Sequence, residues 1–123
     1  MSFFERRKIL KNANYLDLTP ILTKEHLVGE DNSVTVIIPK FSNKFIVDKV
    51  VPKLKHPYIK LNLDELGSAA WLAIDGKKKV KEIAIELSRK FGDKIHPVDE
   101  RLTKFLTQLY EQRLITFEEI KGV

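Results

Sequence analysis

The sequence predicts an α+β fold that begins with a three-stranded antiparallel sheet, continues with three helices and closes with a short strand. Two patterns carry this prediction. In the first half of the chain, apolar residues alternate with other residues, which is the period of a half-buried strand. Between residues 63 and 109 they recur every three or four positions, which is typical of amphipathic helices. The length of 123 residues fits a single domain of this kind.

Three strands are expected before the first helix. Leu27-Val28, the polar residues 30–33 and the alternating Val34–Ile38 read as strand, turn and strand, and Pro39 ends the second strand. Tyr58–Asn62 is the third strand, with Ile59 and Leu61 pointing to one side of it. The sequence therefore predicts a hairpin and a later strand that joins it.

Two segments are set apart from this domain. Residues 1–15 are expected to be a basic tail, and residues 16–123 the domain itself. Residues 40–57 separate the second and third strands by more than a simple hairpin requires, so they are interpreted as an insertion. A short helix is expected inside it, at 43–50.

The helices have recognisable ends. Asn62 is expected to cap the first helix with Glu65 as its reciprocal partner, and Gly76 to end it. The second helix ends at Gly92, and the third begins near Pro97. The apolar faces are Leu63, Leu66, Ala70 and Ile74 in the first helix, Val80, Ile83, Ala84, Leu87 and Phe91 in the second, and Val98, Leu102, Phe105, Leu106 and Leu109 in the third.

The connection between the second and third helices determines the predicted architecture. Residues 92–96 form a short link, so the two helices make a helix-turn-helix arrangement. Leu114–Phe117 then alternates as a closing strand. A helix-turn-helix that follows a sheet predicts a winged helix-turn-helix-like fold whose sheet precedes the helices.

Composition excludes several classes of function. Cysteine is absent, so disulfides, iron–sulfur ligation and thiol nucleophiles are excluded. No apolar run approaches the ~20 residues of a membrane span, and we expect a cytoplasmic protein. The net charge of +5 is compatible with an acidic partner or with a solvated basic surface.

No residue set suggests a reaction centre. The three histidines are far apart and lack the spacing of metal ligands. The paired carboxylates Asp64-Glu65 and Asp99-Glu100 fall at expected helix starts, where acidic groups complement the helix dipole. We therefore expect no catalysis, no metal and no cofactor. Trp71 lies beside the apolar face of the first helix, where it either anchors the core or stacks on a ligand.

The run from Leu61 to Phe117 resembles the PqqD family. The resemblance is carried by the segment from Leu63–Gly67 to Trp71, the Asp75-Gly76 stop, the helix start Val80–Ala84, and Arg101, Phe105 and Leu109 in the third helix. One departure is Lys79, because the family usually has a capping threonine there. A lysine cannot accept helix amide protons, so the start of the second helix should be about 1 kcal/mol less stable.

The resemblance implies a function. PqqD proteins, associated with coenzyme PQQ synthesis, are small peptide-binding domains, also called RiPP recognition elements. They hold the leader segment of a precursor peptide for a modifying enzyme, often a radical-SAM protein. The resemblance also implies the winged-helix-like fold predicted above.

Two modes of binding are considered. In the first, a peptide adds as a strand beside the third strand and packs on the third helix, and the predicted binding residues are Tyr58, Ile59, Lys60, Leu61, Asn62, Arg101, Lys104, Phe105 and Gln108. In the second, the chain is a DNA-binding winged-helix transcriptional regulator whose third helix enters the major groove of DNA. Its exposed charges balance, with Asp99, Glu100 and Glu111 against Arg101, Lys104 and Arg113. Phosphate contacts dominate affinity for DNA, so we prefer the peptide. An open strand edge also permits a homodimer.

Overall fold

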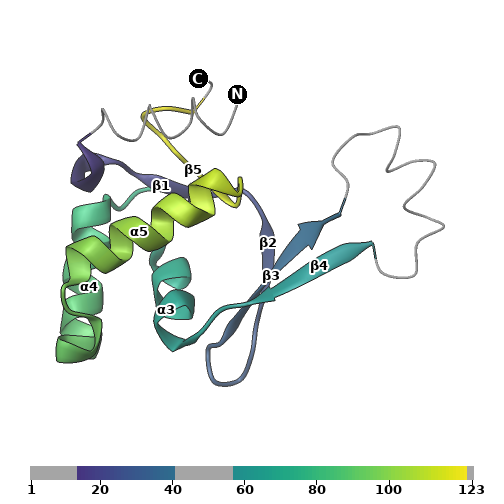
Figure 1. Cartoon of the computed structure of the whole chain (residues 1–123), viewed down its shortest axis with the longest axis horizontal. Coiled ribbons are helices and arrows are strands. Elements are labelled where there is room, and N and C mark those ends of the chain that lie inside the picture. Colours follow the sequence, from purple (N-terminus) through teal and green to yellow (C-terminus); the bar gives the residue numbers. More distant parts are fainter. Residues whose placement is uncertain (1–13, 41–56, 122–123) are drawn as a thin grey trace.

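The computed structural model describes residues 14–40 and 57–121, which form an α+β fold. A three-stranded antiparallel sheet has the order β2 (Glu25–Val28), β3 (Val34–Pro39) and β4 (Tyr58–Asn62). Three helices follow it: α3 (Glu65–Ala73), α4 (Val80–Phe91) and α5 (Val98–Glu111). Figure 1 shows that the ends of β3 and β4 farthest from α3 extend beyond the helices. These strands and helices confirm the predicted α+β order.

The sheet presents one apolar side to the helices. Val34 and Val36 of β3 are buried, and Val36 lies between His26 of β2 and Leu61 of β4. Because successive side chains alternate between the two sides of a strand, these residues share a side. Within the described residues, β2 and β4 are the two edges of this sheet.

The start of α3 differs from the prediction. Asp64, not Asn62, is the N-cap residue, and its Oδ1 accepts a hydrogen bond from the Gly67 amide at 2.7 Å. Asn62 is still part of β4, and its Oδ1 accepts a hydrogen bond from the Thr35 hydroxyl at 2.8 Å. Asn62 therefore remains in β4, and Asp64 caps the helix instead.

The helix-turn-helix region follows the sequence closely. α4 ends at Phe91 and its C-cap residue is Gly92, as expected; the φ of Gly92, 56°, is in the region that favours glycine. A short 3₁₀ helix, η3 (Gly92–Ile95), connects it to α5, which Pro97 precedes. Lys79 makes no side-chain cap, as predicted, although Glu82 Oε1 accepts a hydrogen bond from the Lys79 amide at 3.2 Å.

A second, two-stranded sheet was not predicted. β5 (Ile115–Phe117) is the expected closing strand, but it pairs with β1 (Pro20–Leu22), which the sequence analysis missed. The Glu119 carboxylate closes this pair, since it accepts hydrogen bonds from the Thr19 amide at 2.7 Å and the Thr19 hydroxyl at 2.9 Å. Burial acts to raise the pKa of Glu119, but these two hydrogen bonds outweigh it and hold the pKa below its ordinary value.

The segment before β1 also packs on the helices. It contains the 3₁₀ helix η1 (Tyr15–Asp17), and the Tyr15 hydroxyl accepts a hydrogen bond from Thr107 of α5 at 3.0 Å. Burial raises the pKa of Tyr15 to about 12. The Leu18 carbonyl accepts a hydrogen bond from the Val80 amide at the start of α4. This segment therefore ties β1 to both α4 and α5.

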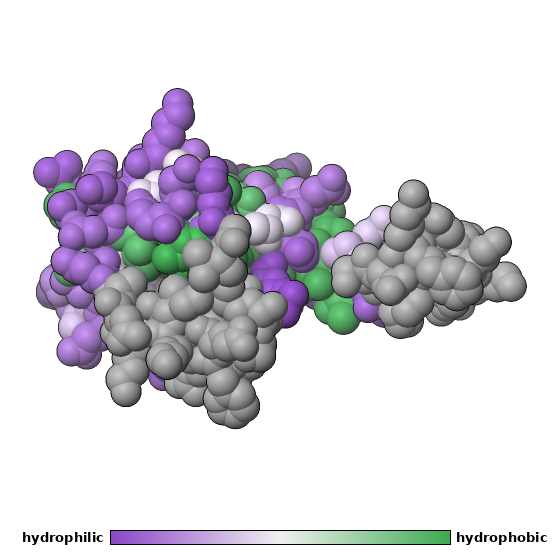
Figure 2. Space-filling view, turned by 90° about the horizontal axis from the view of Figure 1, so that it is seen from above, coloured by the Kyte–Doolittle hydropathy of each residue, from purple (hydrophilic) through white to green (hydrophobic). Residues whose placement is uncertain are grey.

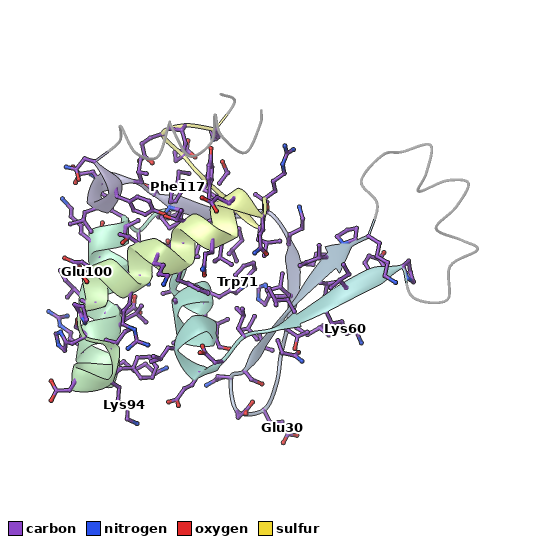
Figure 3. All side chains as sticks on the ribbon, viewed as in Figure 1. Glu30, Lys60, Trp71, Lys94, Glu100 and Phe117 are labelled. Atoms are coloured by element: carbon purple, nitrogen blue, oxygen red, sulfur yellow. The ribbon has the colours of Figure 1, made fainter. Side chains whose placement is uncertain are left out.

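The core lies between the helices and the two sheets. Trp71 and Phe117 are fully buried in it, and Figure 3 shows Phe117 near β5 and Trp71 near α3. The Trp71 ring meets His26 edge-on, with ring centroids 5.9 Å apart, and its full burial supports a role as core anchor over stacking on a ligand. On the predicted apolar faces of the helices, Ile83, Leu87 and Leu102 are buried, whereas Leu66 and Phe105 are only partly buried.

Some predictions fall outside the described residues. The helix expected at 43–50, most of the insertion at 40–57 and most of the tail at 1–15 are among them. Within 14–40 and 57–121, no helix combines the length and apolar content needed to cross a membrane.

Candidate functional site

The outer edge of β4 presents unpaired backbone groups in the described part of the chain. The Lys40 amide donates to the Pro57 carbonyl and the Leu63 amide donates to the Val34 carbonyl, each at 2.9 Å. In an antiparallel ladder, residues alternate between those that bond to the neighbouring strand and those that bond outward. Residues 57, 59, 61 and 63 therefore face β3. The backbone groups of Tyr58, Lys60 and Asn62 face outward.

A groove opens where β4 ends. Its volume is about 370 Å³, and it lies between the end of β4, α3 and α5. Three predicted site residues line it, namely Asn62, Arg101 and Phe105. The residues that the prediction missed are Leu63, Asp64, Leu66, Gly67, Ala70, Leu87, Ile95 and Leu102. Leu66 and Phe105 are partly buried because their side chains form the wall of this groove.

Gly67 allows α3 and α5 to approach each other at the groove. A Cβ atom at this position would lie 3.5 Å from Phe105 Cε1 and 3.0 Å from Asp64 Oδ1. The absence of a side chain leaves the Phe105 ring accessible from the groove. A glycine inside a helical pattern is the sequence signal that should have indicated this close approach.

Arg101 supplies positive charge at the groove and is held in place by the backbone. Its Nη1 donates a hydrogen bond of 2.6 Å to the Lys94 carbonyl at the end of η3. A guanidinium carries five N–H donors, so one contact leaves others for a ligand. Arg101 both fixes the turn before α5 and presents a cation to the groove.

The other predicted site residues lie outside the lining of this groove. Tyr58 and Ile59 are 52% and 51% exposed along the β4 edge, and Lys60 lies on the same strand (Figure 3). Leu61 is partly buried between the sheet and the helices. Lys104 and Gln108 are exposed on α5. The structure thus brings together the end of β4 and the start of α5, while the remaining residues extend along the strand and the helix.

Apolar side chains also reach the surface beyond the helices. Figure 2 shows green, apolar residues beside the helical body, where the β2–β3–β4 sheet lies. Leu27, Val28 and Ile59 are among the exposed large apolar residues. An exposed strand edge with apolar neighbours is a surface on which another strand can add.

The lysines at the start of α4 are partly neutralised. Lys78 Nζ lies 2.9 Å from Glu86 Oε2, and Lys81 Nζ lies 3.1 Å from Asp17 Oδ1. The hydrogen bond to Glu86 raises the pKa of Lys78. These pairs reduce the positive charge that this end of the molecule offers to nucleic acid. Among the described residues, no cluster of three or more His, Asp or Glu could hold a metal ion.

Part of the chain matches a known protein family. Residues 58–115, or 58 of the 123, match the family described as "Coenzyme PQQ synthesis protein D (PqqD)". The matched segment runs from the start of β4 to the start of β5 and contains the whole groove lining. No curated protein and no solved structure matches the chain.

Proposed function

Because the chain carries a PqqD-like domain at residues 58–115, we propose that it is a non-catalytic protein that holds the leader segment of a ribosomally made precursor peptide for a modifying enzyme. The family supports the coarser part of this statement, an accessory peptide-binding role in coenzyme PQQ or related peptide-derived biosynthesis. The mode of binding is argued below from the geometry of β4 and α5.

The observation that carries the proposal is the open edge of β4 beside the groove. The outward backbone groups of Tyr58, Lys60 and Asn62 can bond to an added strand. Side chains alternate along that strand, so those on its inner side would point toward the helices. The groove beside Phe105 would receive one of them at the end of β4.

The charge near this edge suggests the chemistry of the peptide. Lys60 is exposed on β4, Arg101 lies at the groove, and Lys104 is exposed on α5. An extended segment that alternates apolar and acidic residues would place its apolar side chains inward and its acidic ones near these cations. Backbone bonds and apolar contacts would supply most of the affinity, so we expect binding to weaken only modestly with salt.

Two finer statements belong to the same proposal. α4, η3 and α5 after the β2–β4 sheet support interpretation of the fold as a winged helix-turn-helix with its sheet first. The partner would be a modifying enzyme, often a radical-SAM protein in systems of this kind, as the family resemblance implies.

The test is a titration of candidate leader peptides into the ¹⁵N-labelled chain, followed by amide chemical shifts. We expect shifts in residues 58–62 and 101–108. Lys60→Pro should abolish binding and leave the fold intact, because it removes an outward amide. Lys60→Ala is the matched control, since it shortens the side chain and keeps the amide. Shifts confined to the start of α4 would contradict strand addition, as would unchanged binding to Lys60→Pro.

Position 59 gives a complementary control. The Ile59 amide faces β3, so Ile59→Pro should disturb the sheet itself. Its effect on the free energy of unfolding should exceed that of Lys60→Pro. The opposite ranking would mean that the alternation along β4 has been assigned incorrectly.

A further inference from the structure

A second groove lies on a different face of α3. Its volume is about 760 Å³, and its walls come from the β2–β3 turn, α3 and the C-terminal half of α4. Figure 1 shows this turn near the N-terminal end of α3. Glu65, Ala69 and Leu72 of α3 line the second groove. Leu66, Gly67 and Ala70 of the same helix line the groove beside Phe105, which is called the peptide groove from here on. The two sites therefore use separate faces of one helix.

The floor of the second groove is apolar and accessible. Leu72 is 41% exposed although it belongs to a helix whose neighbouring positions, Trp71 and Ala73, are buried. Phe91 is partly buried at the end of α4, and Lys90 Nζ lies 5.5 Å from the centre of its ring. A concave surface of this size, which combines these apolar side chains with polar ones around them, is typical of a binding site.

The rim is acidic in a chain whose net charge is +5. Asp31, Glu65 and Glu86 line the groove, against Lys90 as its one basic lining residue. Glu86 already pairs with Lys78, which leaves two carboxylates, Asp31 and Glu65, against the one cation of Lys90. Hydrogen bonds from Ser33 hold the pKa of Asp31 below its ordinary value, so it stays ionised near neutral pH. The groove therefore favours a partner with basic residues beside apolar ones.

We infer that this second groove binds an apolar and basic segment of the modifying enzyme. The inference rests on the proposed function, because it needs an enzyme that acts on the bound peptide. Leu63 and Leu87 line both grooves, so a segment held in the second lies next to a peptide held in the first. Nucleic acid and anionic membranes would be repelled by the acidic rim.

The first test uses a synthetic twelve-residue amphipathic peptide of Leu and Lys, titrated into the ¹⁵N-labelled chain. We expect amide shifts in residues 31–33, 65–73 and 86–91. Leu72→Ser and Glu65→Lys should each weaken binding by about fivefold or more, the effect of losing about 1 kcal/mol. Ile85→Ser and Glu100→Lys are matched controls, because Ile85 is 53% exposed on α4 outside this groove. A matched peptide of Leu and Glu should not bind.

The second test uses a radical-SAM modifying enzyme of the kind that the family resemblance implies as the partner. Analytical ultracentrifugation should show that Leu72→Ser and Glu65→Lys weaken the complex, while Lys60→Pro leaves it unchanged. Equal weakening by Ile85→Ser, or equal binding of the Leu/Lys and Leu/Glu peptides, would overturn the inference.

The outcomes separate this inference from the proposed function. If the Leu/Lys peptide shifts the amides of the second groove but leader peptides cause no shifts in β4 and α5, the proposed function is wrong. The preference of the second groove for a basic peptide is still supported in that case. If leader peptides bind as proposed, but Leu72→Ser and Glu65→Lys leave the affinity of the enzyme complex unchanged, the inference alone is wrong. Groove signals that change with protein concentration, or on deletion of residues 1–13, would identify the chain itself as the occupant and also overturn it.

Discussion

Gly67→Ala should block the peptide groove with little change in stability. The new methyl group would lie 3.5 Å from Phe105 Cε1, inside the groove, and 3.0 Å from Asp64 Oδ1. That oxygen accepts the hydrogen bond that caps α3, so the carboxylate must shift by a few tenths of an ångström. The substitution therefore acts on the groove and on the cap at the same time.

The two effects on stability oppose each other. Replacing a helical glycine by alanine stabilises a helix by about 1 kcal/mol. Weakening an N-cap destabilises it by about the same amount. We therefore expect the free energy of unfolding to change by less than about 1 kcal/mol. A methyl group forced between a bound side chain and Phe105 resembles an overpacked core, at about 1–3 kcal/mol, which corresponds to about five- to 150-fold weaker peptide binding.

Gly76→Ala is the matched control because its expected effects are reversed. Gly76 has a φ of +78° and nothing within 4 Å of an added Cβ atom. Alanine there should destabilise the fold by about 1–2 kcal/mol through backbone strain, and peptide affinity should be unchanged. Urea denaturation and calorimetric titration of both variants measure the two quantities. Full affinity in Gly67→Ala, or affinity loss in Gly76→Ala at a temperature where it is folded, would refute the assignment of the groove.

Three further predictions concern the core, the second sheet and the basic cluster. Leu87 is 1% exposed, so Leu87→Ala should lower the free energy of unfolding by about 2–5 kcal/mol, and an unmoved denaturant midpoint with an unchanged slope would mean that α4 is misplaced. The pKa of Glu119 is lowered in the folded state, so the stabilisation that its carboxylate gives should be present above the unfolded pKa of 4.5 and disappear as pH falls below that value. The difference in unfolding free energy between the wild type and Glu119→Gln should therefore shrink from pH 6 to pH 3. A difference that stays constant over this range would contradict the prediction. The triple replacement of Lys77, Lys78 and Lys79, which lie just before α4, should leave leader-peptide binding intact. If the wild type binds duplex DNA with a steep dependence on salt and the triple variant does not, the chain is a DNA-binding regulator instead.

The helices were predictable from sequence because their signals are local. Gly92 and Pro97 mark a stop and a start that depend only on backbone geometry. The missed cap at Asp64 shows where local signals conflict. Asn62 and Asp64 are both good caps, and the choice depends on Asn62 remaining paired with Thr35 across the sheet. Pairing of this kind is a tertiary contact that the spacing of residues does not contain.

The β1–β5 sheet and the groove were harder to predict for the same reason. Pro20–Leu22 has only three residues, too few to show a period, and its partner lies nearly a hundred positions later. The groove was anticipated at Arg101 and Phe105, since both belong to the third helix and to the family pattern. Leu66 was assigned to the core because an apolar helix face does not show which residues line an opening.

The register of β1 with β5 has a consequence for how the domain can be divided. The segment that matches the family, residues 58–115, contains β4 without β3, and only the first residue of β5 without β1. A protein cut to these residues would expose the edge of β4 that pairs with β3, lack the β1–β5 sheet, and lose the Leu18 carbonyl that accepts the hydrogen bond from the Val80 amide. It would also uncover the core side of α3 that Val34 and Val36 now cover. The smallest piece to transplant as a fusion partner therefore begins before Tyr15 and extends past Glu119.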